Sequence, residues 1–284
     1  MKRSLEIIED FKEFKTIPHV SVRLSQLLSK NDCSIGELET VIKYEPSLVL
    51  RLLRIVNSAH YGLLSKVESI SDAIIYIGLE SLKNVVIVDA LKNIFKGCKS
   101  GDLFSPERLF LHSAVVAITA QMISERILGQ KGDGAFLCGI LHDTGMIVEY
   151  QVEEENFLKA CSEFQTSKGS FTGYEKQYIG ADHCEIAYQL AKDWELPQTV
   201  LEPVKKHHSN LDKVDPESLQ GILVISEFMT ARLSYTEIES YEIELPSVCS
   251  EYINDNIWEF KELANVLPDA IMNAKELYRL GGDE

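Results

Sequence analysis

Five of the seven histidines in this sequence fall in its last two-thirds, and an aspartate adjoins one of them. An imidazole that faces a helical core needs a partner for each ring nitrogen, because an unpaired buried polar group is costly. One shared metal ion satisfies several imidazoles and a carboxylate together. We therefore predict a metal site, with mutual hydrogen bonding of the same side chains as the alternative. The residues are His112, His142, Asp143, His183, His207 and His208.

The spacing of apolar residues around these histidines predicts that they face the interior. His112 is followed by apolar residues at three- and four-residue intervals, and so is His183. The rows that end at His207 and at His208 both pass through Val204. The imidazoles are therefore expected to converge from three helices.

One polar pair interrupts an otherwise apolar segment. Residues 135–148 are apolar almost all round, apart from His142 and Asp143. An ionised aspartate in a buried helix needs a cation or several hydrogen-bond donors. The two remaining histidines, His19 and His60, stand at a proline-associated turn and in a loop, and we interpret both as structural.

Composition excludes several classes of protein. The chain has 284 residues, which is enough for a large core and one or two domains, and its content of 45% hydrophobic and 25% charged residues is ordinary for a globular protein. The net charge of −16 repels a phosphate backbone, and no stripe of lysine and arginine compensates for it. Direct binding of nucleic acid is therefore not expected.

The N-terminus and the cysteines indicate a cytoplasmic protein. No window approaches eighteen uncharged apolar residues, and the first residues form a charged amphipathic stretch without a signal-peptide core. We therefore expect no contact with a membrane. The six cysteines, at positions 33, 98, 138, 161, 184 and 249, form no CxxC pair. They are expected to be free thiols and not part of a disulfide framework or a zinc site.

The periodicity is helical nearly throughout and predicts an all-α fold. Ser34 and Glu37 have the spacing of a capping box and should open a helix that runs to about Tyr44. Pro46 suits the first position of the next helix, which should end near Asn57.

Glycines mark the breaks between later helices. Gly78 should separate a helix over residues 71–77 from one over residues 80–95, and the glycines within residues 166–180 predict a loop. A further helix is expected to begin after Pro268.

Residues 97–104 resemble a linker, and we place a boundary there. The chain then divides into an N-terminal helical half (residues 1–100), a helical bundle with the metal site (residues 101–235) and an acidic helical extension (residues 236–284).

The order of the histidines and Asp143 resembles that of the HD superfamily of metal-dependent phosphohydrolases. Three N-terminal stretches, residues 17–31, 45–62 and 67–79, narrow the resemblance to the HDOD domain, the HD-related output domain of bacterial signalling proteins. The similarity extends over about residues 15–235. It implies an N-terminal helical subdomain packed on an HD-like helical bundle. It also implies regulatory output through contacts with other signalling proteins, without a general enzymatic activity, and leaves self-association open.

The resemblance also implies a set of metal ligands. A final aspartate of the superfamily pattern is replaced here by Glu227, and an acidic residue expected before His112 is missing, with Arg108 one turn upstream. The sequence after the histidine pair is Ser209-Asn210-Leu211 and not the GYP type of cyclic-dinucleotide hydrolases, so we do not expect that activity. Imidazole and carboxylate ligands suit iron, manganese, nickel or zinc. The implied ligands are His112, His142, Asp143, His183, His207, His208 and Glu227.

Two functions remain open at this point. The first is a signalling module that binds proteins, and the second is a metal-dependent phosphohydrolase that acts on a nucleotide or phosphate ester. A phosphohydrolase normally has lysine or arginine beside the transferred phosphate, and here the nearest such residues are Lys205 and Lys206. Whether the chain is an enzyme is left open, and the non-catalytic function is favoured.

Overall fold

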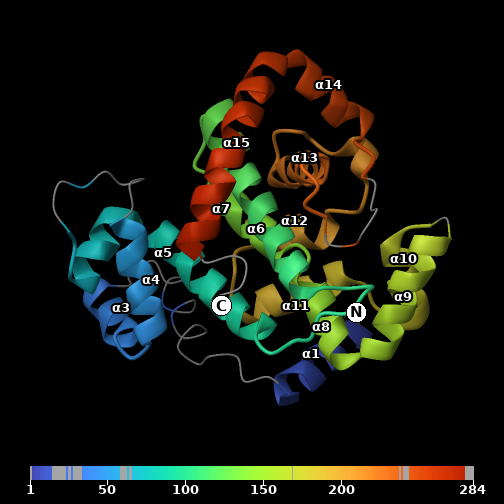
Figure 1. Ribbon diagram of the computed structural model, residues 1–284, viewed down its shortest axis with the longest axis horizontal. Coiled ribbons are helices and arrows are strands. Elements are labelled where there is room, and N and C mark those ends of the chain that lie inside the picture. Colours follow the sequence, from blue (N-terminus) through green and yellow to red (C-terminus); the bar gives the residue numbers. More distant parts are fainter. Residues whose placement is uncertain are drawn as a thin grey trace.

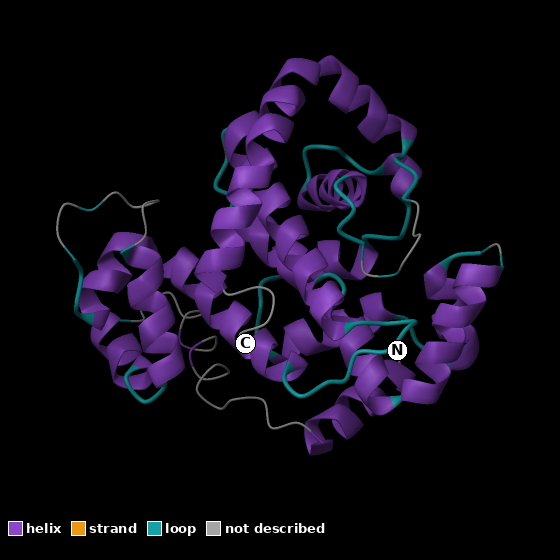
Figure 2. Ribbon diagram, viewed as in Figure 1, coloured by secondary structure: helices purple, strands orange, loops and turns teal. Residues whose placement is uncertain are grey.

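The structure is a computed structural model, and within the residues it describes the chain consists of helices without any strand (Figures 1 and 2). The predicted all-α fold is therefore confirmed. His19 and His60 lie outside the described residues, so their predicted structural roles stay predictions. The described residues are 2–14, 24, 27, 34–57, 63, 66–167, 169–236, 238 and 243–278.

The helices follow one another through the chain with short connections. They are α1 (Lys2–Phe14), α3 (Ile35–Ile42), α4 (Pro46–Val56), α5 (Ile70–Phe95), α6 (Pro106–Met122), the π-helix η1 (Ile123–Ile127), α7 (Asp133–Leu141), α8 (Thr144–Val152), α9 (Glu154–Thr166), α10 (Phe171–Tyr178), α11 (His183–Asp193), α12 (Gln198–Lys206), the 3₁₀-helix η2 (Leu211–Lys213), α13 (Leu219–Arg232), α14 (Ser247–Asp255) and α15 (Ile257–Tyr278).

Local sequence signals set the boundaries of α3 and α4. The Ser34 hydroxyl accepts a hydrogen bond from the Glu37 main-chain N–H, and the Glu37 carboxylate accepts one from the Ser34 N–H at 3.0 Å. This reciprocal pair is the predicted capping box. Helix α4 begins at Pro46 and ends before Asn57, as predicted.

Helix α5 connects two hydrophobic cores. Gly78, with φ of +78°, breaks its helical geometry at the predicted point. The smaller core gathers α3, α4 and the first part of α5, and it contains buried residues from Leu24 to Val86. The larger core begins with Ile87 on the second part of α5 and extends over the remaining helices (Figure 1).

The larger core also includes the N-terminal helix. Ile7, Ile8 and Phe11 of α1 are buried in it, because α1 packs against α8 and α11. Lys12 of α1 forms an ion pair with Asp193 at 2.5 Å. The two cores thus do not follow the division at residues 100 and 101, and the three-part domain division stays a prediction.

Two sequence-based predictions about helices were wrong. Residues 166–180 are not one loop, because Ser170 caps helix α10 there through the main-chain N–H of Gly173. Pro268 does not start a new helix, since it lies inside α15. Buried Leu263 and Leu267 continue the apolar row of α15 through this position, where the helix packs against α6.

No helix in the described part of the chain is both long enough and apolar enough to span a bilayer.

Candidate metal site

Asp143 lies at the centre of a buried cluster of imidazoles. It occupies the turn between α7 and α8, where its carboxylate forms no capping bond with α8. Its Oδ2 atom is 3.0 Å from His142 Nε2 and 3.4 Å from His112 Nε2. Its Oδ1 atom is 3.4 Å from His183 Nε2 and 3.5 Å from His207 Nε2. The carboxylate therefore bridges two pairs of histidines.

Main-chain carbonyls fix the orientation of three of these rings. The Nδ1 atoms of His112, His142 and His207 each lie 2.7–2.8 Å from a carbonyl oxygen. A carbonyl can only accept, so each Nδ1 carries the hydrogen and each Nε2 presents its lone pair to the cluster in the neutral ring. The carbonyls belong to Tyr235, Gly139 and Val204, in that order.

A carboxylate fixes the fourth ring. His183 Nδ1 lies 2.8 Å from both carboxylate oxygens of Glu175, which also accepts the His183 main-chain N–H at 3.3 Å. Carboxylate partners of this kind orient ligating histidines and raise their basicity. Sequence reasoning missed Glu175 because it expected a loop over α10. The available signal was a glutamate in the row Phe171, Glu175, Tyr178, at the spacing of a buried helix face.

A second buried carboxyl group, that of Glu149, interacts electrostatically with Glu175 and was also missed by sequence reasoning. Glu149 on α8 is fully buried, and neither of its carboxylate oxygens has a hydrogen-bond donor among the described groups. Burial, followed by the neighbouring charge of Glu175, raises the pKa of Glu149 well above its ordinary value. Burial and the charge of Glu175 therefore both favour the protonated form of Glu149 over the ionised form.

The spacing of the imidazole nitrogens fits a bound cation. His112 Nε2 and His142 Nε2 are 3.2 Å apart, and His183 Nε2 and His207 Nε2 are 3.3 Å apart. When both rings of a contact are neutral and protonated at Nδ1, the contact brings two lone pairs together in a dry site, which is unfavourable unless a cation joins them. Two metal–nitrogen bonds of about 2.1 Å at a tetrahedral angle would place the nitrogens about 3.4 Å apart. The donor set therefore fits a metal.

The electrostatics of the cluster favour positive charge. Burial alone would raise the pKa of Asp143, but His142, His112 and His207 hold it well below the usual value. Burial opposes protonation of His183 and His207, yet their neighbours raise both pKa values well above the ordinary one, with Cys184 the largest contributor to each. Protons therefore compete with a metal for this cluster.

Glu227 and His208 complete the predicted set. Glu227 lies on α13, is 4% exposed, and places Oε1 at 3.3 Å from His142 Nε2. The rings of His208 and His207 have centroids 4.1 Å apart. Burial, followed by the charges of His207 and His183, holds the pKa of His208 well below its ordinary value. The structure thus brings all seven sequence-predicted residues together in three overlapping groups.

A glycine allows the two sides of the cluster to approach each other. A β-carbon at Gly145, in the first turn of α8, would lie 2.0 Å from the main-chain oxygen of His183. Real β-carbon contacts do not approach this distance, so α8 and α11 can pack this closely only with glycine at this position. Gly145 therefore helps to bring Asp143 within reach of His183.

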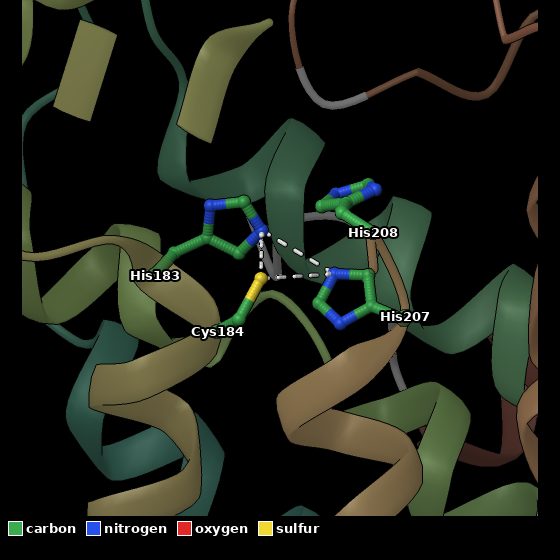
Figure 3. A group of neighbouring side chains, drawn as sticks. All are labelled: His183, Cys184, His207 and His208. Atoms are coloured by element: carbon green, nitrogen blue, oxygen red, sulfur yellow. Dashed lines mark hydrogen bonds between the residues drawn. The ribbon is translucent and has the colours of Figure 1, made fainter. Parts of the chain in front are cut away.

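One residue of the cluster was not predicted. Cys184 Sγ lies 3.4 Å from His183 Nε2 and belongs to a group of possible ligands with His183, His207 and His208 (Figure 3). The sequence signal was its position directly after His183, on the first turn of the same helix.

Comparison with known proteins gives one family. The HDOD domain family matches residues 14–210 of the chain. An uncharacterised protein of Treponema pallidum is 23% identical over 252 aligned residues, and the match covers 86% of this chain and 47% of that protein. The chain thus spans about half the length of this curated relative.

Solved structures share the fold. An HDOD domain protein of unknown function from Geobacter sulfurreducens has a TM-score of 0.72 and 23% identity, over 95% of this chain and 97% of that one. A protein from Shewanella amazonensis, provisionally named a phosphohydrolase, has a TM-score of 0.71 and 21% identity, over 96% and 97%. A provisionally named signal transduction protein from Marinobacter aquaeolei has a TM-score of 0.70 and 20% identity, over 93% and 59%. At these identities the likeness shows the fold alone.

Proposed function

The chain belongs to the HDOD domain family, and on this premise we propose that it is a regulatory signalling module whose buried cluster binds a divalent transition metal. The observation that carries the proposal is the pairing of oriented imidazole lone pairs around one buried carboxylate. His112 and His142 face one oxygen of Asp143, and His183 and His207 face the other. Imidazole and carboxylate donors suit iron, manganese, nickel or zinc.

The burial of the cluster favours regulation over catalysis. His112, His142, Asp143 and His183 are at most 3% exposed, and His207 is fully buried. Structural metal sites are closed, whereas catalytic sites keep a position open to water or substrate. A phosphate ester would reach these ligands only after the surrounding helices opened.

The two lysines that precede His207 in the sequence do not serve a phosphate either. Lys206 pairs with Glu202 at 2.6 Å, and the Lys205 ammonium lies 4.7 Å from the centre of the Tyr188 ring. Both lysines therefore interact with side chains that do not belong to the cluster. A buried metal to which neither of these two lysines is directed agrees better with a role in stabilising one conformation.

One observation supports hydrolysis as a second candidate. Asp143 presents separate oxygens to two pairs of histidines, and a bridging carboxylate is suited to hold two cations side by side. Such cations, when bound, would acidify water and polarise a phosphoryl oxygen. In that case Asp143 and the four imidazoles would hold the ions, and His208 would be the most accessible residue of the cluster.

A direct contact links the cluster to the residue that precedes the C-terminal extension. The Tyr235 carbonyl, which orients His112 at 2.8 Å, immediately precedes the extension that contains α14 and α15. Helix α15 packs against α6 and η1 of the larger core and against α4 of the smaller one. Metal occupancy could in this way set the position of a helix that contacts both cores. We propose that a signalling protein, or a second copy of the chain, recognises that arrangement.

The proposal is tested by loading the protein with each metal and measuring two properties. We expect amide exchange in α15 and around Tyr235 to slow when metal is bound. We expect the metal-loaded protein to hydrolyse bis-p-nitrophenyl phosphate and p-nitrophenyl phosphate no faster than the same metal ion in solution without protein. In-cell photocrosslinking should then capture a defined partner with wild-type protein but not with Asp143→Asn. Metal-dependent turnover that Asp143→Asn abolishes would establish the hydrolase instead.

A further inference from the structure

Cys184 brings a sulfur atom to one half of the cluster. Its Sγ atom lies 3.4 Å from His183 Nε2 and 3.9 Å from His207 Nε2, and the side chain is 4% exposed. Figure 3 shows this sulfur and the two ring nitrogens turned toward one another, with the ring of His208 beside them. The three atoms form a triangle, because the two nitrogens are 3.3 Å apart.

When both rings are neutral, hydrogen bonding within the triangle cannot satisfy all three atoms. His183 donates from Nδ1 to Glu175, and His207 donates from Nδ1 to the Val204 carbonyl. Their Nε2 atoms are therefore acceptors in the neutral rings, and a thiol has one hydrogen to give. That hydrogen can serve one of the two nitrogens, which leaves the contact between His183 and His207 without a donor.

A single cation satisfies the triangle. Zinc-type bonds of about 2.3 Å to sulfur and about 2.0 Å to nitrogen, at a tetrahedral angle, place sulfur and nitrogen about 3.5 Å apart and two nitrogens about 3.3 Å apart. The two sulfur–nitrogen distances, 3.4 and 3.9 Å, lie on either side of the first value, and the nitrogen–nitrogen distance of 3.3 Å matches the second. His208 is close enough to supply a further ligand, since it belongs to the same group within 4.8 Å.

The other half of the cluster offers a different set of donors. His112 and His142 there face Asp143 Oδ2, and Glu227 Oε1 lies 3.3 Å from His142 Nε2. This set contains nitrogen and oxygen only, which suits iron or manganese, whereas a set with sulfur selects softer ions. The two halves share Asp143 but not the same chemistry.

We infer that Cys184 is a sulfur ligand to a soft divalent cation held with His183 and His207, so that this half of the cluster is selective for zinc-like ions. The inference rests on the proposed metal site and specifies the chemistry of one part of it. Binding deprotonates the thiol, so one proton leaves Cys184 for solvent as the metal–sulfur bond forms, and no oxidant or reductant is needed.

Cobalt is the probe, because a bond between cobalt and thiolate gives a charge-transfer band in the near ultraviolet. Wild-type protein loaded with Co²⁺ should show this band, and Cys184→Ser should lose it. The matched control is Cys249→Ser, which changes another fully buried free thiol on α14, outside the three groups of possible ligands. This control should keep the band. Far-ultraviolet circular dichroism checks the fold of each variant, and Cys184→Ala is a second variant with the same expected loss.

Titrations measure the selectivity. Loss of even an outer partner of a metal ligand costs roughly ten- to a hundredfold in affinity, so Cys184→Ser should weaken Cd²⁺ binding at least about tenfold. Binding of Mn²⁺ should change much less, because sulfur contributes little to a hard ion. The same selectivity in Cys184→Ser and in wild type would overturn the inference.

The outcomes separate this inference from the proposed function. Cobalt that binds to wild-type protein without a charge-transfer band overturns the role of Cys184 and leaves the metal site standing. Protein that binds neither Co²⁺ nor Cd²⁺ nor Mn²⁺ overturns both. A band that survives in Cys184→Ser assigns the sulfur to another cysteine and likewise overturns the inference.

Discussion

The two cores of this molecule differ in what holds them together. Between residues 34 and 77, the described buried side chains of the smaller core are all aliphatic. The larger core encloses the histidines, Asp143 and three buried glutamates, Glu149, Glu175 and Glu227, among its apolar residues. Aliphatic burial is favourable for each side chain alone, whereas buried charges are tolerated only with partners or a metal. The stability of the larger core should therefore depend on metal and pH more than that of the smaller core, beside which Arg51 of α4 and Asp89 of α5 form an ion pair at 2.7 Å.

The largest effect should come from the close contact between α8 and α11. Gly145→Ala puts a β-carbon 2.0 Å from the His183 carbonyl oxygen, so the helices must separate. We expect a loss of roughly 4 kcal/mol or more in unfolding free energy, together with metal affinity. Gly36→Ala in α3 is the control, since nothing lies within 4 Å of that position. There alanine should stabilise by up to about 1 kcal/mol. Urea unfolding and metal titration check both, and a Gly145→Ala protein that binds metal normally would contradict the geometry.

A cavity in the smaller core should cost stability without affecting metal. Leu52 on α4 is fully buried there, and Leu52→Ala removes three carbon atoms from an aliphatic environment. The expected loss is about 3 kcal/mol. The metal content per folded molecule should stay at the wild-type value. A lower metal content in Leu52→Ala than in wild type, measured by elemental analysis, would show that the two cores are coupled and would contradict the comparison.

The buried carboxyl groups should give the larger core a specific pH dependence. The pKa of Glu149 is raised on folding. An unfolded glutamate ionises at about pH 4.3, whereas the folded one ionises only at a higher pH. Between these two pKa values the native state therefore binds more protons than the unfolded state. Stability that is fully present below this window is therefore lost as the pH rises through it, by about 1.4 kcal/mol per unit.

Replacing the carboxyl group should remove this dependence. Glu149→Gln keeps the shape without the titration, so its unfolding free energy should fall less steeply with pH than that of the wild type. Glu9→Gln, on an exposed position of α1, should leave the slope unchanged. Parallel slopes for Glu149→Gln and wild type in metal-free protein would show that Glu149 ionises normally.

The smallest effect concerns the cap of α3. Ser34→Ala removes the hydroxyl that accepts the Glu37 N–H, and loss of such a cap costs about 1 kcal/mol. The midpoint of thermal unfolding should fall slightly while metal content and the pH slope stay as in wild type. A change in the metal content or in the pH slope of Ser34→Ala would show that the smaller core influences the metal site.

The same contrast explains how much could be predicted from sequence. Short-range signals were sufficient at Ser34, Pro46 and Gly78, because capping and helix breaking involve residues within one turn. The histidines and Asp143 were predicted to converge, since their apolar faces are a periodic feature of each helix. Glu227 was placed from the family resemblance alone.

The features of the fold and of the site that were not predicted from the sequence depend mostly on contacts between helices that are distant in the chain. Glu175 orients His183 from α10, a helix whose glycines suggested a loop. Glu149 stands out only once the fold brings it near Glu175, and Cys184 only once α12 brings His207 to it. Pro268 ends a helix in most local contexts, but the apolar row of α15 holds the helix together across it.

The most direct test of the account is the metal content of purified protein, measured together with its thermal unfolding. We predict that wild-type protein holds at least one first-row transition metal and unfolds at a higher temperature than the chelated form, because an ion at a hundred times its Kd contributes about 2.7 kcal/mol. Asp143→Asn should lose metal and stability, with Asp10→Asn on the exposed side of α1 as the control. Occupancy should fall as the pH drops, and the fall should begin above the free imidazole pKa of about 6.5, because the pKa values of His183 and His207 are raised well above it. Wild-type protein that stays metal-free after incubation with iron, manganese, nickel and zinc, with Asp143→Asn no less stable, would contradict the account and leave a cluster held by hydrogen bonds alone.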